Sequence, residues 1–518
     1  MAGQGARIVV IVAVGLAAIG GALAVRETRT REAVVPMAVT RPALPFRSFM
    51  ARVIETSRIA DPLQRCLRMP DPPDSHWHAE GVAAYCRYRY RPTMTLTEFR
   101  QLVADGKAAE VDRVMGDYQH TQSEDPTDQS RLDGAFYRMG LTEFTPETRR
   151  AVDAWKKQRP QSAFAVAASG FQYHSAAWVA RGEDAASDTP EEKWVAMRKL
   201  AALARAELDR AANMQPTIPL VSADRFSLGI LTGDETYAEE ALASGRIASP
   251  GAMSPRLIQS SMSGSNWGAG APALLSQAND AAAIANRFPL LWVVVGRARM
   301  KAATDPSIRN RAKTDFLAAA VEVATAVDLG ALANRAYRDG EFSQALILAV
   351  EAWRFDDGEP NALYVIGFAS QHARYEDWAR TTLKNAARNH PDAIEVARNA
   401  GVALLALKES AEAERLLSYA IQRNPDDVWT LTQLGFLYLN SAHRYDRAKT
   451  IASSLIRLDD DNPDGYALRT FAQIETDDPE RYTSIHAFLD RFEQRDGEQY
   501  ASDSMRQYLG EHPEPLKR

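Results

Sequence analysis

Residues 394–427 read IEVARNAGVALLALKESAEAERLLSYAIQRNPDD, and this stretch decides the fold of the C-terminal third of the chain. Its positions 8, 20 and 27 are small residues, and small residues recur at a step of 34 on both sides: Ala333, Gly367, Gly401 and Gly435; Ala345, Ala379 and Ala413, with Ala448 one residue late; Ala352, Ala386 and Ala420. A period of 34 is typical of paired antiparallel helices that stack on the next pair. Small residues at matching places mean that helices approach too closely there for a larger side chain.

The remaining repeat positions resemble the tetratricopeptide repeat family. The matching residues are Leu363 and Leu431 at position 4, Leu332, Ile366 and Leu434 at position 7, Tyr438 at position 11, and Pro391 and Pro425 at position 32. The resemblance implies an all-α fold, an α-solenoid of helical hairpins. We expect four repeats at 326–359, 360–393, 394–427 and 428–465, followed by a C-terminal helical cap and tail over 466–518. Pro360 and Pro463 are expected to close second helices about three residues late, and His443-Arg444 marks an extra residue in the fourth repeat.

The resemblance also implies a concave groove that holds a protein or peptide partner. In the family, positions 2, 5, 9, 12 and 13 of each first helix line this groove. Carried over, the candidate residues are Asn334, Tyr337, Arg338, Asn361, Tyr364, Phe368, Gln371, His372, Glu395, Arg398, Leu405, Trp429, Thr432, Phe436 and Asn440. The alternative is that these rings pack under neighbouring helices. The basic cradle that family members use for a terminal carboxylate is not reproduced, because position 5 of the first repeat is Gly330.

The middle of the chain, 93–300, is expected to be an irregular helical domain, joined to the repeats by a connecting helix at 301–325. Thr95 and Glu98 have the spacing of a capping box at a helix start. The region resembles a bacterial domain of unknown function that precedes helical repeats, through Trp155, Ala176-Ala177-Trp178, Arg181-Gly182, Thr189-Pro190 with Trp194, and Asn266-Trp267-Gly268. This resemblance implies no activity.

The N-terminus, residues 1–26, predicts a membrane anchor or a signal segment. Ile8 to Val25 is an uncharged run long enough, as a helix, to cross a thin bilayer. The small residues Ala22-Leu23-Ala24 would also suit a cleavage site, so both possibilities stay open. Arg26, Arg29 and Arg31 after the run favour a cytoplasmic body, whereas the cysteines favour export.

Residues 27–92 are expected to be a linker and a loop that carries the only two cysteines, Cys66 and Cys86. An even count in a proline-rich loop suggests a disulfide, which an oxidising compartment would permit. Two alternatives stay open: a metal site with His76 and His78, and two unlinked buried thiols. On balance we expect a single-pass inner-membrane anchor with a periplasmic body in a bacterial cell envelope.

Composition and motifs bound the function. The chain has 518 residues, and 61 Lys and Arg residues against 67 Asp and Glu residues leave a net charge of −6, which argues against a nucleic-acid partner. The alternating segment Tyr85 to Arg91 is expected to be a short strand with one aromatic face. No phosphate loop, nucleophile elbow or metal-ligand spacing is present, so we predict no catalytic, cofactor or metal residues.

The leading hypothesis is therefore a membrane-tethered scaffold that binds a protein or peptide partner. The alternative is an enzyme of unknown reaction with its site in the central helical domain, and the sequence favours the scaffold.

Overall fold

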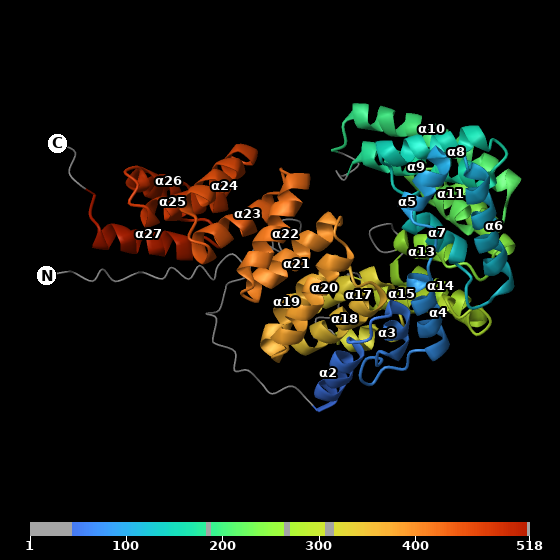
Figure 1. The fold of residues 1–518 in the computed structure, drawn as a ribbon, viewed down its shortest axis with the longest axis horizontal. Coiled ribbons are helices and arrows are strands. Elements are labelled where there is room, and N and C mark those ends of the chain that lie inside the picture. The colour runs from blue at the N-terminus through green and yellow to red at the C-terminus, as the bar shows by residue number, and fades with distance from the viewer. Residues whose placement is uncertain (1–43, 183–187, 264–269, 306–314, 515–518) are drawn as a thin grey trace. The chain divides into compact units, whose positions relative to one another are not determined.

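The protein is described by a computed structural model, which places residues 44–182, 188–263, 270–305 and 315–514. Within these ranges the regular structure is entirely helical (Figure 1). The chain divides into two compact units. We call residues 44–332 and 350–356 the N-terminal body, and the described residues among 333–349 and 357–514 the C-terminal repeats.

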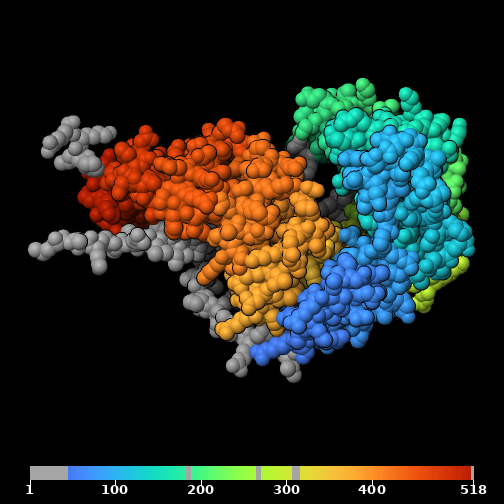
Figure 2. All heavy atoms as spheres, viewed as in Figure 1, coloured from blue at the N-terminus to red at the C-terminus, as the bar shows by residue number. Residues whose placement is uncertain are grey.

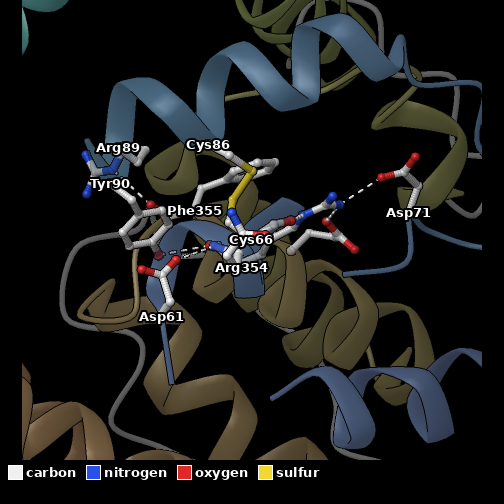
Figure 3. The surroundings of a disulfide bond; sticks show 10 residues. Asp61, Cys66, Asp71, Cys86, Arg89, Tyr90, Arg354 and Phe355 are labelled. Atoms are coloured by element: carbon white, nitrogen blue, oxygen red, sulfur yellow. Dashed lines mark hydrogen bonds and ion pairs between the residues drawn. A yellow bond between two sulfur atoms is a disulfide. The ribbon is translucent and has the colours of Figure 1, made fainter. Parts of the chain in front are cut away.

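The N-terminal body begins with three short helices, α2 (Leu44–Thr56), α3 (Pro62–Arg68) and α4 (Ala79–Tyr90). Cys66 on α3 and Cys86 on α4 form a disulfide (Figure 3). Both cysteines are fully buried, so the bond lies in the interior of the body. The prediction of a disulfide is confirmed, and the thiols are not available as metal ligands.

The prediction of a strand over Tyr85 to Arg91 is wrong, because helix α4 continues to Tyr90. In a helix, residues three and four apart share a face. Tyr85 and Tyr88 accordingly stack with ring centroids 6.0 Å apart. The alternation of aromatic and basic residues is compatible with either element, and packing against the rest of the body selects the helix.

Eleven further helices follow in the described part of the body before the first repeat. They are α5 (Leu96–Ala104), α6 (Ala108–Glu124), α7 (Arg131–Arg138), α8 (Pro146–Gln158), α9 (Ala163–Arg181), α10 (Glu191–Met214), α11 (Pro219–Thr232), α12 (Glu235–Ala248), α13 (Ser254–Ser261), α14 (Gly270–Ala285) and α15 (Leu291–Thr304). A short turn of helix, α16 (Phe316–Ala319), comes next. The predicted capping box is confirmed, since Thr95 and Glu98 each bond to the other's backbone N–H.

A single apolar core joins α5 to α11, and its large side chains include Phe99, Phe136, Trp155 and Phe171. All four are fully buried. Phe99 meets Trp155 edge-on, and Phe136 meets Phe171 edge-on, with ring centroids 5.4 Å and 5.1 Å apart. In the space-filling view, the atoms of the cyan segments form a continuous outer surface (Figure 2).

The repeat region consists of consecutive helices. They are α17 (Ala326–Arg338), α18 (Phe342–Phe355), α19 (Pro360–Ala373), α20 (Glu376–Asn389), α21 (Ile394–Ala406), α22 (Ser410–Arg423), α23 (Val428–Phe436), α24 (Tyr445–Leu458), α25 (Pro463–Glu475), α26 (Arg481–Phe492) and α27 (Gln499–Glu511). Pro360 and Pro463 do not close second helices as expected. Each is the first residue of the next helix, and Glu359 and Asn462 cap those helices. Proline suits this position because the first helical N–H has no intrahelical partner.

The small residues of the 34-residue period lie where helices touch. A Cβ atom built on Gly367 would lie 2.4 Å from the Cβ of Ala403, one repeat further on. A Cβ on Gly435 would lie 2.3 Å from Leu468 Cδ2, and a Cβ on Gly401 would lie 3.0 Å from Leu417 Cδ2. The alanines of the pattern are buried as well. Close helix contact is thus the cause of the period, as predicted.

The extra residue of the fourth repeat is accommodated by a helical distortion. After α23, residues Leu437–Ser441 form a π-helical turn. The N–H of Ala442 donates to the carbonyl of Leu437, five residues earlier. A single π turn adds one residue without breaking the helix. This insertion explains why Ala448 comes one position late.

No helix among the described residues is long and apolar enough to cross a bilayer. The predicted membrane or signal segment, residues 1–26, lies outside the described residues.

Candidate functional site

The predicted groove residues lie on the first helices of the repeats. Asn334, Tyr337 and Arg338 come from α17, and α19 supplies five more. Two contacts join these helices laterally. Asn334 Nδ2 donates to Asn361 Oδ1 at 3.1 Å, and the rings of Tyr337 and Tyr364 meet edge-on at 6.2 Å between centroids. The two residues of each pair are 27 positions apart in the sequence. This is the 34-residue repeat period minus about seven residues, which is two helical turns. The first helices therefore lie side by side in a fixed register.

Five rings form an aromatic cluster on this face, which we define as Tyr337, Phe342, Tyr364, Phe368 and His372. Tyr337 contacts Phe342 at 5.6 Å and Phe368 at 6.0 Å between ring centroids. Tyr364 contacts Phe368 at 4.5 Å. The imidazole of His372 stacks on Phe342, with centroids 3.7 Å apart and planes nearly parallel. Aromatic rings offer a large contact area with little loss of side-chain entropy, which is why they serve as anchors at interfaces.

The aromatic cluster carries no charge at neutral pH. Burial, followed by the neighbouring Tyr337, raises the pKa of Tyr364 to about 12. Burial also raises the pKa of Tyr337 and lowers the pKa of His372 below its ordinary value. The phenols therefore stay protonated and the imidazole stays neutral. Such a surface favours apolar and aromatic side chains of a partner over charged ones.

A second group of candidates lies further along the repeats. The guanidinium of Arg398 on α21 lies 5.4 Å from the ring centroid of Trp429 on α23. It also pairs with Glu395 at 2.5 Å and with Asp427 at 3.4 Å. Because two carboxylates already pair with its charge, the main role of Arg398 is to link α21 to the start of α23.

The candidates differ in exposure. Arg338, Gln371, His372 and Glu395 are exposed, and Asn334, Tyr337, Asn361, Tyr364, Arg398, Leu405, Trp429, Phe436 and Asn440 are half-buried. Phe368 and Thr432 are buried, with 5% and 1% of their surface exposed. The structure thus brings the residues of α17 and α19 together, while Phe368 forms the floor of the cluster and Thr432 does not reach the surface.

Phe342 belongs to the cluster but was not predicted. It is the first residue of α18, a second helix, whereas the family pattern assigns the groove to first helices. The turn at Gly340, with φ of +80°, brings it back over Tyr337. The sequence does indicate that the two rings are close, since Phe342 follows Tyr337 by five residues across a short turn. That spacing does not show whether Phe342 lies on the surface or in the core.

In the central domain, where the alternative hypothesis places an enzyme site, His174 lies between a carboxylate and a hydroxyl group. His174 Nδ1 lies 2.9 Å from Asp224 Oδ2, and its Nε2 lies 3.0 Å from Ser227 Oγ, which is the order of groups in a Ser-His-Asp triad. However, Trp178 Nε1 donates to the same Nε2 at 3.0 Å. Since an indole N–H can only donate, it occupies the lone pair that a catalytic base needs.

Ser227 is also 2% exposed, so a substrate cannot reach its hydroxyl. The group therefore fastens α9 to α11 and does not present a nucleophile.

Comparisons with known proteins agree with this architecture. The family model described as a tetratricopeptide repeat matches residues 404–470. A model described as a domain of unknown function, DUF4034, matches residues 95–255. Both resemblances expected from the sequence are confirmed. No protein of curated function matches the sequence.

Several solved structures are similar to parts of the chain. YrrB, described as a TPR protein with an unusual peptide-binding site, is 18% identical, with 35% of this chain and 92% of that chain covered, at a TM-score of 0.28. MamA from Desulfovibrio magneticus is 19% identical, with 33% and 97% covered, at a TM-score of 0.28. Yeast Tom70 is 11% identical, with 81% and 96% covered, at a TM-score of 0.32.

Proposed function

We propose that the protein is a scaffold that captures an apolar or aromatic peptide segment of a partner protein on its aromatic cluster. The single observation that supports this most strongly is the group of contacting rings on α17, α18 and α19. Tyr337 and Tyr364 keep part of their surface exposed, and His372 is exposed. The neighbouring amides of Asn334 and Asn361 can hydrogen-bond the backbone of an extended peptide once their mutual bond opens.

Peptide selection on the purified full-length chain tests this proposal. A random peptide library should yield ligands whose affinity falls at least about tenfold in Tyr364→Ala and in Tyr337→Ala, because buried aromatic anchors dominate such interfaces. Phe368 is unsuitable for this purpose, since truncating a buried ring would destabilise the fold itself. The matched control is Thr381→Ala on α20, an exposed second-helix residue outside the cluster. Equal affinity in all variants would reject the cluster as the binding site.

We also propose that the body is held outside the cytoplasm of a bacterial cell by the N-terminal segment. Two observations support this: the uncharged run from Ile8 to Val25 and the buried disulfide between Cys66 and Cys86. Disulfides persist in oxidising compartments and are rare in the cytosol. Cells should be lysed directly into a denaturant with a thiol-blocking reagent. Cysteines that label only after reduction support export, and cysteines blocked at once contradict it.

A further inference from the structure

The N-terminal body contains a cavity of about 230 Å³, remote in sequence from the aromatic cluster. Its wall is built from α4, α7, α11, α13 and α15. The polar lining residues that matter most are Tyr88, Asp133, Tyr137, Asp224 and Arg297. They come from four separate helices, so the cavity results from the packing of the body.

Asp133 is a buried carboxyl group with one oxygen that can still accept a hydrogen bond. It is 1% exposed. Its Oδ2 accepts a hydrogen bond from the hydroxyl of Ser254, whereas no donor in the described part of the chain has hydrogen-bond geometry with its Oδ1. Burial raises the pKa of Asp133 to about 7, although the hydroxyl of Ser254 and the backbone N–H of Leu220 both favour the charged form. A buried acceptor without a donor costs free energy, and a ligand that donates there would recover it.

Asp224 adds a second carboxylate whose charge is not neutralised. Its Oδ2 lies 2.9 Å from His174 Nδ1. Because Trp178 donates to Nε2 of the same ring, His174 is the neutral tautomer with its proton on Nδ1. A neutral imidazole donates a hydrogen bond to Asp224 but brings no positive charge.

The one guanidinium among the lining residues, that of Arg297, has its charge paired, although no acceptor among the described residues reaches its buried Nε. Arg297 Nη1 lies 2.8 Å from Asp328 Oδ2, and its Nη2 donates to Ser261 Oγ at 2.6 Å. An anion entering the cavity would therefore meet two carboxyl groups and a cation that is already paired. A cation would meet the carboxyl groups and the rings of Tyr88 and Tyr137, whose faces attract positive charge.

We propose that this cavity is a binding site for a small organic cation of the alkylammonium class, held by Asp133 and Asp224 against the rings of Tyr88 and Tyr137. The ammonium group donates to Asp133 Oδ1, and its single positive charge offsets one of the two carboxylate charges. Three separate observations agree on this chemistry: the cavity, the buried oxygen without a hydrogen-bond donor, and the lack of an Arg or Lys ion pair to either carboxyl group among the described residues. This site is independent of the proposed peptide surface, so either can fail without the other.

Calorimetric titration of the purified full-length chain at pH 8 tests the proposal. The probes are methylammonium, ethanolamine, putrescine and choline, and ethylene glycol is the neutral counterpart of ethanolamine. We expect at least one cation to bind at one site per chain with a Kd below about 1 mM. The neutral counterpart, acetate and inorganic phosphate should not bind.

Two variants locate the site. Asp133→Asn should weaken cation binding at least about tenfold, because it removes one charge of a desolvated pair. Leu257→Trp should abolish binding by filling the cavity while leaving both carboxyl groups in place, and it serves if Asp133→Asn fails to fold. The control Asp377→Asn removes a fully exposed carboxylate and should change nothing. The proposal is overturned if no cation binds with a Kd below 10 mM, which corresponds to about 3 kcal/mol of binding free energy. It is also overturned if cation binding survives in Leu257→Trp, or if an anion binds instead of a cation.

Discussion

Arg354 at the end of α18 donates a hydrogen bond from Nε to the carbonyl oxygen of Cys66, 288 residues earlier in the chain, at 2.8 Å (Figure 3). Its Nη1 also donates to Asp71 at 2.8 Å and to Glu351 at 3.1 Å. Arg354 and Glu351 are both buried. The guanidinium thus joins the end of the first repeat's second helix to the loop that the disulfide closes.

Removing this arginine should destabilise the body strongly. We expect Arg354→Met to lower the free energy of unfolding by about 3 kcal/mol, because it leaves Glu351 buried without a counter-charge and the Cys66 carbonyl without a donor. The double variant Arg354→Met, Glu351→Leu should recover part of the loss. Denaturant unfolding measures both. If the double variant loses as much stability as the single variants Arg354→Met and Glu351→Leu lose together, the two side chains are not coupled.

Loss of the disulfide should destabilise the same region. The bond joins residues 20 positions apart. In a chain-entropy estimate, replacing both cysteines by serine costs about 3 kcal/mol. Unfolding of the wild type in a strong reductant should match that of the Cys66→Ser, Cys86→Ser variant in buffer. A variant as stable as the oxidised wild type would show that the bond does not constrain the body.

The small residues of the period can be tested at Gly367. Gly367→Leu should lower the free energy of unfolding by about 3 kcal/mol or prevent folding, because even a Cβ atom there overlaps Ala403. The control is Gly116→Ala in the middle of α6, where an added Cβ meets nothing within 4 Å. That change should stabilise by about 0.5–1 kcal/mol through helix propensity. Thermal unfolding distinguishes the two, and a neutral Gly367→Leu would contradict close helix contact.

Asp133 makes a defined contribution to the pH dependence of stability. Its pKa is about 7 in the folded protein and 3.8 as the unperturbed value, so the folded state keeps a proton that the unfolded state has lost. The contribution is therefore full below about pH 4 and is lost as the pH rises through about 7, with a total on the order of 4 kcal/mol. The nearby charged and titratable groups are Asp224, Tyr88, Tyr137 and Arg297.

The measurement is the difference in free energy of unfolding between the wild type and Asp133→Asn from pH 4.5 to 8. Asparagine resembles the protonated carboxyl group and does not titrate. We expect the wild type to lose stability relative to the variant as the pH rises. Parallel curves would show that Asp133 has the same pKa in both states.

Much of the repeat fold could be predicted from particular residues. Gly367, Gly401 and Gly435 occur at a fixed step because a stacked helix leaves no room for a side chain, and such a steric demand appears directly in the sequence. The contacts of the aromatic cluster were only partly predictable. Tyr337 and Tyr364 followed from their repeat positions, but the burial of Phe368 and the arrival of Phe342 from α18 depend on how neighbouring helices cross.

The strand expected over 85–91 shows the limit of local patterns. In a strand, alternating tyrosine and arginine side chains would point to opposite faces. In a helix, the same sequence places Tyr85 and Tyr88 on one side. The hydroxyl oxygen of Tyr85 accepts a hydrogen bond from the backbone N–H of Ala326 at 3.1 Å. This contact spans 241 residues, so no local pattern could have indicated it.

The sequence by itself determined the helical period and the places where helices must touch, because close packing restricts side-chain size at each repeat. It also supplied the two cysteines and the apolar N-terminal run. Only the tertiary structure decided that Arg354 is buried beside Cys66, that His174 is committed to Trp178, and that Asp133 faces a cavity. Each of these depends on residues far apart in the chain, and the free energy of a buried polar group is set by the partners that folding brings to it.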